Sequence, residues 1–183
     1  MKKEERRLFY LLKRYAFKKG DFTLSSGKKS PYYIDARLVT LSPEGAYLCA
    51  RIIFEKISDE KISALGGPCI GADPILGAIA MYSFTKKTPI KTFIIRKESK
   101  AYGRKRLIEG QDLKRGDTVV LIDDVVTTGS SLLRSKEILA KMGVKVKKVI
   151  CLIDRQEGAE ENLKREKIEL VPIFRVEDFL KDA

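Results

Sequence analysis

Short apolar runs alternate with longer amphipathic segments along the chain. The runs are rich in Ile and Val, as buried strands are, and cover residues 62–66, 90–95, 118–123, 148–154 and 168–174. Segments with helical spacing cover 43–58, 73–84, 130–142 and 157–166, and a separate N-terminal helix is expected over 2–19. Strands and helices in alternation are typical of a parallel sheet with helices on both faces. The pattern therefore predicts a doubly wound α/β fold.

The composition indicates one globular domain with a strong positive charge. The 183 residues are 44% hydrophobic and contain no low-complexity tract or Gly/Pro-rich linker. Lys and Arg number 37 against 25 Asp and Glu, which gives a formal net charge of +12. Such a surplus attracts phosphates, nucleic acids or acidic membranes, although a well-solvated surface gives the same count. One short segment concentrates several of these cations: Lys97, Lys100, Arg104, Lys105 and Arg106.

The cysteine and histidine content excludes two kinds of site. The three cysteines, Cys49, Cys69 and Cys151, are irregularly spaced, and the chain has no histidine. Zinc sites that combine Cys with His, and catalytic Cys–His pairs, are therefore excluded. The apolar N-terminal run LFYLL is too short for a signal peptide core or a membrane span. We expect a soluble cytoplasmic protein with reduced thiols.

The loop after the third predicted strand carries the most informative chemistry. Parallel sheets bind ligands at the carboxyl ends of their strands, where loops lead into helix N-termini. Here the strand ends at Asp123 and Asp124, and TTGSS (127–131) leads into the next helix. Hydroxyl groups and successive backbone N–H groups at a helix N-terminus form a nest for an anion. The glycine patterns of nucleoside triphosphate and dinucleotide sites do not occur in this loop, which favours a single phosphate.

The acidic pair requires a different ligand group, because carboxylates repel a phosphate. A sugar diol or Mg²⁺ would suit Asp123 and Asp124, and a solvated turn or helix cap is the alternative. The loop after the first strand, GGPCIGADP (66–74), offers glycines and a helix start for a second anion, although a tight turn would show the same residues. A ligand with a phosphate, a sugar diol and a second anionic group is a phosphorylated ribose that carries pyrophosphate.

The stretch VVLIDDVVTTGSS (119–131) resembles the signature of phosphoribosyltransferases that use 5-phosphoribosyl 1-diphosphate. Three further stretches resemble orotate phosphoribosyltransferases in the same order: FTLSSGKKSPYYID (22–35), RKESKAYGRKRLIEG (96–110) and LIDRQEG (152–158). Together with GGPCIGADPI, these stretches span nearly the whole chain. The resemblance implies transfer of the phosphoribosyl group to orotate, which gives orotidine 5-monophosphate and pyrophosphate in de novo pyrimidine biosynthesis.

The same resemblance implies a type I phosphoribosyltransferase fold with a mostly parallel sheet. Residues 1–40, approximately, would form a small N-terminal hood over the base, and residues 41–183 would form the core. Mg²⁺, held by substrate oxygens and water rather than by protein ligands, is the implied cofactor. The implied assembly is a homodimer in which residues of a mobile lid serve the neighbouring subunit's site.

The resemblance also assigns roles to individual residues. Asp123 and Asp124 would hold the ribose hydroxyls and stabilise positive charge at C1, while Lys100 would be the catalytic cation of the lid. Arg155 would grip the orotate carboxylate, with Thr127 and Tyr33 beside the base, although Tyr32 and Tyr33 could equally be core residues. The implied contacts with 5-phosphoribosyl 1-diphosphate are Arg96, Lys97, Lys100, Tyr102, Asp123, Asp124, Val125, Val126, Thr127, Thr128, Gly129, Ser130 and Ser131.

Three positions depart from what many members of the resembled family have. Ser25 and Gly71 stand in place of lysine, and Tyr102 stands in place of a lid histidine. The missing lysines weaken the case for pyrophosphate contacts at those two positions. Tyr102 can donate a hydrogen bond, but a phenol pKa of about 10 prevents it from shuttling protons as histidine does.

Two alternatives stay open. A purine phosphoribosyltransferase would share the acidic pair and the phosphate nest, but it would not need Arg155 for a base carboxylate. A regulator that binds RNA or DNA on the same fold would use the net charge of +12. No stretch of the sequence resembles a helix-turn-helix extension or an aromatic base-stacking platform. The sequence therefore supports a regulator less well than either enzyme.

Lys100→Ala tests the role assigned to the lid. We expect kcat to fall while the melting temperature stays close to that of the wild type, because a lid residue is mostly exposed and contributes little to folding. Steady-state kinetics and thermal unfolding of the same preparation check this. Unchanged turnover would mean that another residue is the catalytic cation.

Overall fold

The computed structural model describes the chain except residues 24–26, 28, 99–106 and 182–183. Its helices are α1 (Lys3–Leu11), α2 (Arg37–Thr40), α3 (Pro43–Ile57), α4 (Asp73–Thr85), α5 (Ser130–Lys141), α6 (Ala159–Arg165) and α7 (Val176–Lys181), with a π-helical turn over Leu12–Ala16. Its strands are β1 (Phe17–Thr23), β2 (Lys29–Ile34), β3 (Ala64–Pro68), β4 (Lys91–Ile95), β5 (Ile108–Gly110), β6 (Thr118–Val126), β7 (Lys145–Asp154) and β8 (Glu169–Arg175). None of the described helices is long and apolar enough to cross a bilayer.

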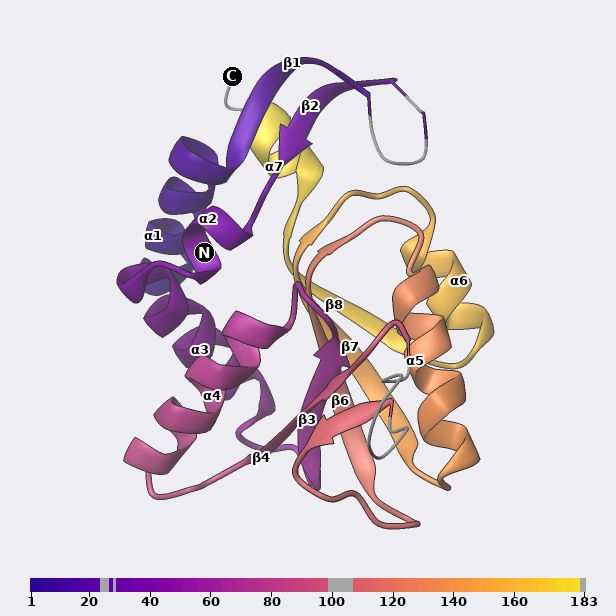
Figure 1. Ribbon diagram of the computed structural model, residues 1–183. Coiled ribbons are helices and arrows are strands. Elements are labelled where there is room, and N and C mark those ends of the chain that lie inside the picture. The colour runs from indigo at the N-terminus through magenta and orange to yellow at the C-terminus, as the bar shows by residue number, and fades with distance from the viewer. Residues whose placement is uncertain (24–26, 28, 99–106, 182–183) are drawn as a thin grey trace.

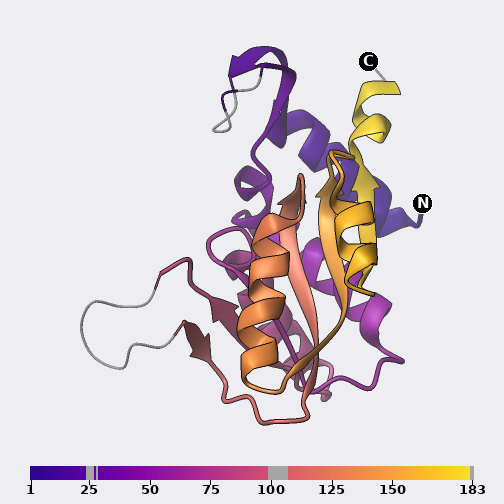
Figure 2. The ribbon, with the colours of Figure 1, turned by 90° about the vertical axis from the view of Figure 1, so that its right-hand side faces the viewer.

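The central sheet has six strands in the order β5-β4-β3-β6-β7-β8. Its neighbouring strands are parallel except for β5, which pairs antiparallel with β4. Helices α3 and α4 cover one face, while α5 and α6 cover the other (Figure 1). Figure 2 shows α5 and α6 lying along the second face. The predicted doubly wound, mostly parallel α/β fold is confirmed.

Strand β6 explains why the sheet needs helices on both sides. Val120 and Ile122 belong to the apolar core under α3 and α4, whereas Val119 and Leu121 belong to the core under α5 and α6. Successive side chains of a strand point to opposite faces, so a strand that is apolar at every position is stable only with both faces covered. The buried part of β6 thereby holds its next residues, Asp123 and Asp124, at the carboxyl edge of the sheet.

The N-terminal segment differs from the helix predicted over residues 2–19. Helix α1 ends at Leu11, and after the π-helical turn β1 pairs with β2 in an antiparallel hairpin. The Phe17 ring stacks on the rings of Tyr32 and Phe179, with centroid distances of 5.7 Å and 5.5 Å. These contacts join residues far apart in the chain, so the local sequence pattern could not reveal them. The hairpin lies above the loops that follow β6 and β7 (Figure 1).

Glu60, in the connection between α3 and β3, anchors that connection to the start of β7. Its carboxylate pairs with the ammonium group of Lys147 and accepts a hydrogen bond from Lys148 Nζ at 2.5 Å. Hydrogen bonds from Lys147 and Lys148 lower the pKa of Glu60 to about 2. The Lys148 side chain is only 11% exposed, so Glu60 supplies the counter-charge to a largely desolvated ammonium group.

We expect Glu60→Gln to lower the melting temperature at neutral pH, because it leaves Lys148 without its counter-charge. The pKa of Glu60 lies below its ordinary value of 4.5, so the stabilisation is complete above about pH 4.5 and is lost as the pH falls toward 2. Melting temperatures of the variant and the wild type should therefore converge in acid. Glu166→Gln removes an exposed pair with Lys136 and serves as the control that changes little. Equal stability of Glu60→Gln and wild type at neutral pH would contradict this role.

Candidate active site

The acidic pair lies at the end of β6, where the backbone holds both carboxylates. Asp123 Oδ1 accepts a hydrogen bond from the Asp124 N–H at 3.0 Å, and Asp124 Oδ1 accepts one from the Val125 N–H at 2.7 Å. Asp123 is buried and Asp124 is partly buried. The two side chains are thus fixed before any ligand binds.

Burial makes this pair electrostatically unfavourable in its charged form. It raises the pKa of Asp123 well above the ordinary range, and the charge of Asp124 raises it further. Burial also raises the pKa of Asp124, while the Val125 N–H and, more weakly, the charge of Arg37 oppose that rise. Ligand hydroxyls that donate hydrogen bonds, a cation, or positive charge that develops during a reaction would relieve the unfavourable energy.

The hydroxyl-rich loop lies directly beside the pair. Gly129 has a φ of 76° and caps the N-terminus of α5, a left-handed conformation that favours glycine. Ser131 Oγ donates a hydrogen bond of 3.5 Å to Asp123 Oδ2, which links the loop to the acidic pair. The first N–H groups of a helix lack intrahelical acceptors, and the hydroxyls of Thr128 and Ser130 are exposed beside them. The arrangement suits a phosphate next to a sugar.

A cavity of about 340 Å³ joins the start of α5 to the end of β4. Its lining includes Arg96, Lys97, Ser130, Ser131 and Arg134. Arg134 Nη2 donates a hydrogen bond to the carbonyl oxygen of Lys97. Two residues predicted for the pyrophosphate end and two predicted for the phosphate loop therefore share one cavity.

Gly71 closes the other side of the acidic pair. A Cβ atom at this position would lie 2.2 Å from Asp124 Oδ1 and 3.0 Å from Asp123 Oδ1. Only a residue without a side chain allows the backbone to lie this close to both carboxylates. A lysine at position 71 would therefore clash with the Asp124 carboxylate in its present position.

Arg155 follows β7 and lies under the hairpin. Its guanidinium lies over the Tyr32 ring at 4.9 Å from the centroid, and its Nη2 contacts Glu157 Oε1 at 2.8 Å and donates to Ser30 Oγ at 3.5 Å. Its Nε is buried without a hydrogen-bond partner among the described residues. A buried guanidinium nitrogen in this state lacks an acceptor that an anionic ligand would supply.

Comparisons with known proteins decide the family. The model of the Phosphoribosyl transferase domain matches residues 39–177. An orotate phosphoribosyltransferase of Aquifex aeolicus is 42% identical over 97% of this chain and 98% of its own length. The chain belongs to the orotate phosphoribosyltransferase family.

Solved structures of orotate phosphoribosyltransferases agree with this assignment. The Mycobacterium tuberculosis H37Rv enzyme in complex with 5-phospho-alpha-D-ribosyl 1-diphosphate has a TM-score of 0.80 at 31% identity and covers 96% of this chain and 98% of its own. Adenine phosphoribosyltransferase from Leishmania donovani, with a TM-score of 0.67 and 17% identity over 93% of this chain and 80% of its own, shares the fold alone. The predicted family and enzyme class are confirmed.

Most of the predicted site residues that the structure describes lie at the carboxyl edge of the sheet, where β4, β6 and β7 end. Tyr33 is exposed on β2, where its ring lies 5.6 Å from that of Phe22. Lys100 and Tyr102 lie outside the described residues, as does Ser25.

Two residues of this region, Arg37 and Arg134, were not predicted from the sequence. Ser30 and Tyr32 belong to a stretch that resembles the family, but Tyr32 was considered there only as a possible core residue. The alternation of buried and exposed positions in SPYYI distinguishes Tyr32 from Tyr33, since only one of two neighbouring strand residues faces inward. Arg134 follows Ser130 by one helical turn, a spacing that places it on the same face of α5.

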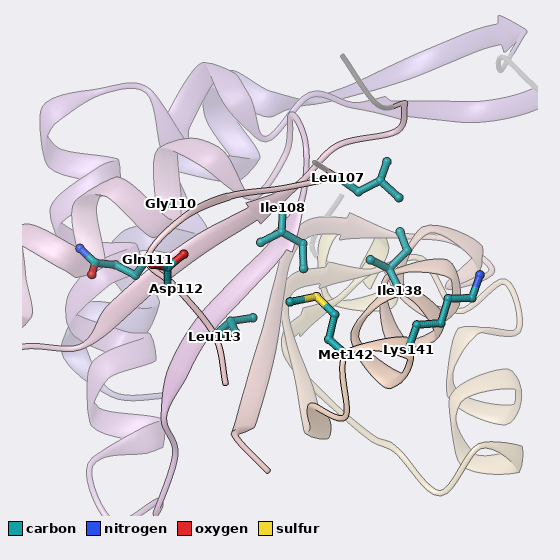
Figure 3. Close-up of a pocket in the computed structure, with 9 residues that line it drawn as sticks. All are labelled: Leu107, Ile108, Gly110, Gln111, Asp112, Leu113, Ile138, Lys141 and Met142. Atoms are coloured by element: carbon teal, nitrogen blue, oxygen red, sulfur yellow. The ribbon is translucent and has the colours of Figure 1, made fainter. Parts of the chain in front are cut away.

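A further cavity, of about 500 Å³, lies between β5 and the C-terminal half of α5 (Figure 3). Leu107, Ile108, Leu113, Ile138 and Met142 give it apolar walls. None of the residues predicted to bind substrate lines it.

Proposed function

We propose that this protein uses the acidic pair, the hydroxyl-rich loop and Arg155 to carry out the reaction of its family, the transfer of phosphoribosyl from 5-phosphoribosyl 1-diphosphate to orotate. Asp123 and Asp124 hold the ribose hydroxyls, and Val125, Val126 and the loop from Thr127 to Ser131 bind the 5-phosphate. Arg96, Lys97, Lys100 and Tyr102 serve a pyrophosphate, some of them in the site of the neighbouring subunit. The observation that carries the choice of base is the buried Arg155 Nε without a partner among the described residues.

Electrostatics supplies the catalytic effect. The bond from C1 to a pyrophosphate oxygen breaks, and its electron pair leaves with pyrophosphate. A bond from C1 to a ring nitrogen of the base forms as that nitrogen loses its proton to pyrophosphate or water, and positive charge develops on the ribose in between. Two desolvated carboxylates held at Asp123 and Asp124 stabilise that charge more than they stabilise the neutral ground state. The reaction requires no protein nucleophile.

Arg155 selects the base. Its guanidinium accepts a carboxylate with paired, charge-assisted hydrogen bonds, and the stacked Tyr32 ring holds its orientation. Thr127 and Tyr33 complete the base site. Purine bases carry no carboxylate, so they would leave the Arg155 Nε unpaired.

Mg²⁺ is the proposed cofactor. The described residues contain no group of three or more His, Cys, Asp or Glu side chains that could hold a metal ion. Mg²⁺ binds phosphate oxygens and water readily, so the donor set fits an ion carried mainly by pyrophosphate. When bound, Mg²⁺ neutralises charge on the leaving group. We also propose a cytoplasmic location, which the three free cysteines support.

A homodimer is the proposed assembly, and α4 supplies the support. Its sequence is apolar nearly all round, a pattern typical of a buried helix, yet Met81 and Phe84 are exposed, Phe84 by 75%. Leu38, Leu41 and Ile70 add exposed apolar surface near its N-terminus, and Ile70 also lines the cavity that reaches Asp124. A second copy on this surface would bury these side chains and bring its own residues close to the active site.

We expect Phe84→Glu to shift the protein from dimer to monomer, because a charge in an apolar interface is costly to desolvate. Leu180→Glu changes an exposed apolar residue on α7 and is the control, which should stay dimeric. Light scattering coupled to size-exclusion chromatography measures both. A monomeric wild type would exclude the dimer.

The function is tested by pyrophosphate release with Mg²⁺ and either orotate or hypoxanthine as the base. We expect turnover with orotate alone. Arg155→Ala should raise the KM for orotate by about a hundredfold, with a much smaller effect on the KM for 5-phosphoribosyl 1-diphosphate, because a charged bidentate contact is worth about 3 kcal/mol. Turnover with hypoxanthine and none with orotate would overturn the assignment, and equal effects of Arg155→Ala on both KM values would remove its role in base selection.

A further inference from the structure

Arg37 lies at the junction between the hairpin and the core, on the side of the acidic pair away from α5. It is the first residue of α2 and follows β2 closely in the chain. Its Nε donates to Asp35 Oδ1 at 2.9 Å and its Nη2 donates to Asp35 Oδ2 at 3.1 Å. The side chain of Arg37 is 43% exposed. The guanidinium is therefore held in a fixed plane and still accessible to a ligand.

The same guanidinium borders a cavity of about 210 Å³ that reaches the acidic pair. Asp124, Gly71 and Ile70 line this cavity together with Arg37. Among the described residues of its lining, Arg37 is the only one with a positive charge. The electrostatic attraction is mutual: Asp35 mainly, and Asp124 to a smaller extent, raise the pKa of Arg37. A ribose held by the acidic pair would thus have Arg37 within reach on one side.

The structure of 5-phosphoribosyl 1-diphosphate determines which of its groups would lie near Arg37. If the 5-phosphate lies at the N-terminus of α5, the pyrophosphate at C1 must extend from another part of the ribose. The cavity that Arg37, Gly71 and Asp124 line is open beside the acidic pair and offers space for that group. A pyrophosphate in this cavity would carry several negative charges next to Asp124, which requires a positive charge nearby.

We propose that Arg37 is a pyrophosphate-binding residue and that Asp35 is a positioning residue that orients its guanidinium. This inference rests on the proposed function, since it takes 5-phosphoribosyl 1-diphosphate as the ligand. Arg37 compensates the charge of Asp124 when the cavity is empty and binds the diphosphate when it is filled.

The experiment compares Arg37→Gln with Arg7→Gln. Arg7 forms the same kind of two-bond pair, with Glu44 at 2.7 Å and 2.9 Å, on the exposed surface of α1 and α3, and is therefore a matched control. Calorimetric titration of the full-length protein measures the Kd for pyrophosphate and for 5-phosphoribosyl 1-diphosphate with Mg²⁺. Ribose 5-phosphate, which lacks the diphosphate, is the third ligand.

We expect Arg37→Gln to weaken binding of both diphosphate ligands by about tenfold to a hundredfold, the usual loss for a charged hydrogen-bonded contact. Binding of ribose 5-phosphate should change by less than about twofold. Asp35→Asn should weaken diphosphate binding less than Arg37→Gln, since it removes the orientation of the guanidinium and keeps its charge. Arg7→Gln should match the wild type for all three ligands.

Diphosphate binding by Arg37→Gln as tight as by Arg7→Gln would overturn the proposal. An equal loss for ribose 5-phosphate would also overturn it, because that result indicates general damage at the junction of hairpin and core. Orotate is absent from these titrations, so a failed orotate assay would leave their outcome unchanged. Absence of 5-phosphoribosyl 1-diphosphate binding by the wild type would overturn both proposals.

Discussion

Two carboxylates held out of water at the end of a buried strand are the constraint on which the rest of this structure depends. Strand β6 can enter the interior because both of its faces are covered by helices, and this burial removes solvent from Asp123 and Asp124. In the absence of ligand, the cost is relieved only in part by backbone N–H groups, by Ser131 and by the nearby charge of Arg37. Such a site binds most strongly to a group that becomes positive.

The surrounding elements follow from this constraint. Hydroxyls and N–H groups at the start of α5 lie on one side of the pair, and Gly71 and Arg37 lie on the other. The acidic pair alone would repel a sugar that carries a phosphate and a diphosphate, so anion-binding groups on two sides are needed to hold it. The hairpin then covers Arg155, whose buried Nε has no hydrogen-bond partner among the described residues and can donate to an anionic ligand.

Long-range contacts decide the secondary structure of segments whose local sequence pattern is ambiguous. The segment after Leu11 has a composition that suits a helix, yet Phe17 becomes part of a strand because its ring packs between Tyr32 and Phe179. The antiparallel strand β5, which the sequence pattern did not predict, spans only Ile108–Gly110 and depends on its pairing with β4. Strands this short carry too little periodicity to be recognised without their partner.

Arg155 was singled out by the resemblance to a family and not by a local pattern. The order of the helices and parallel strands from α3 to β8, and the position of the acidic pair and the hydroxyl-rich loop, could be predicted from the sequence alone. These features depend on periodicity and on residue types at fixed spacing, which are local properties of the chain. Only the tertiary structure decided that Tyr32 rather than Tyr33 stacks on Arg155, that Gly71 lies against both carboxylates, and that Arg37 shares a cavity with Asp124. These are distances between segments remote in sequence, and packing of the whole fold sets them.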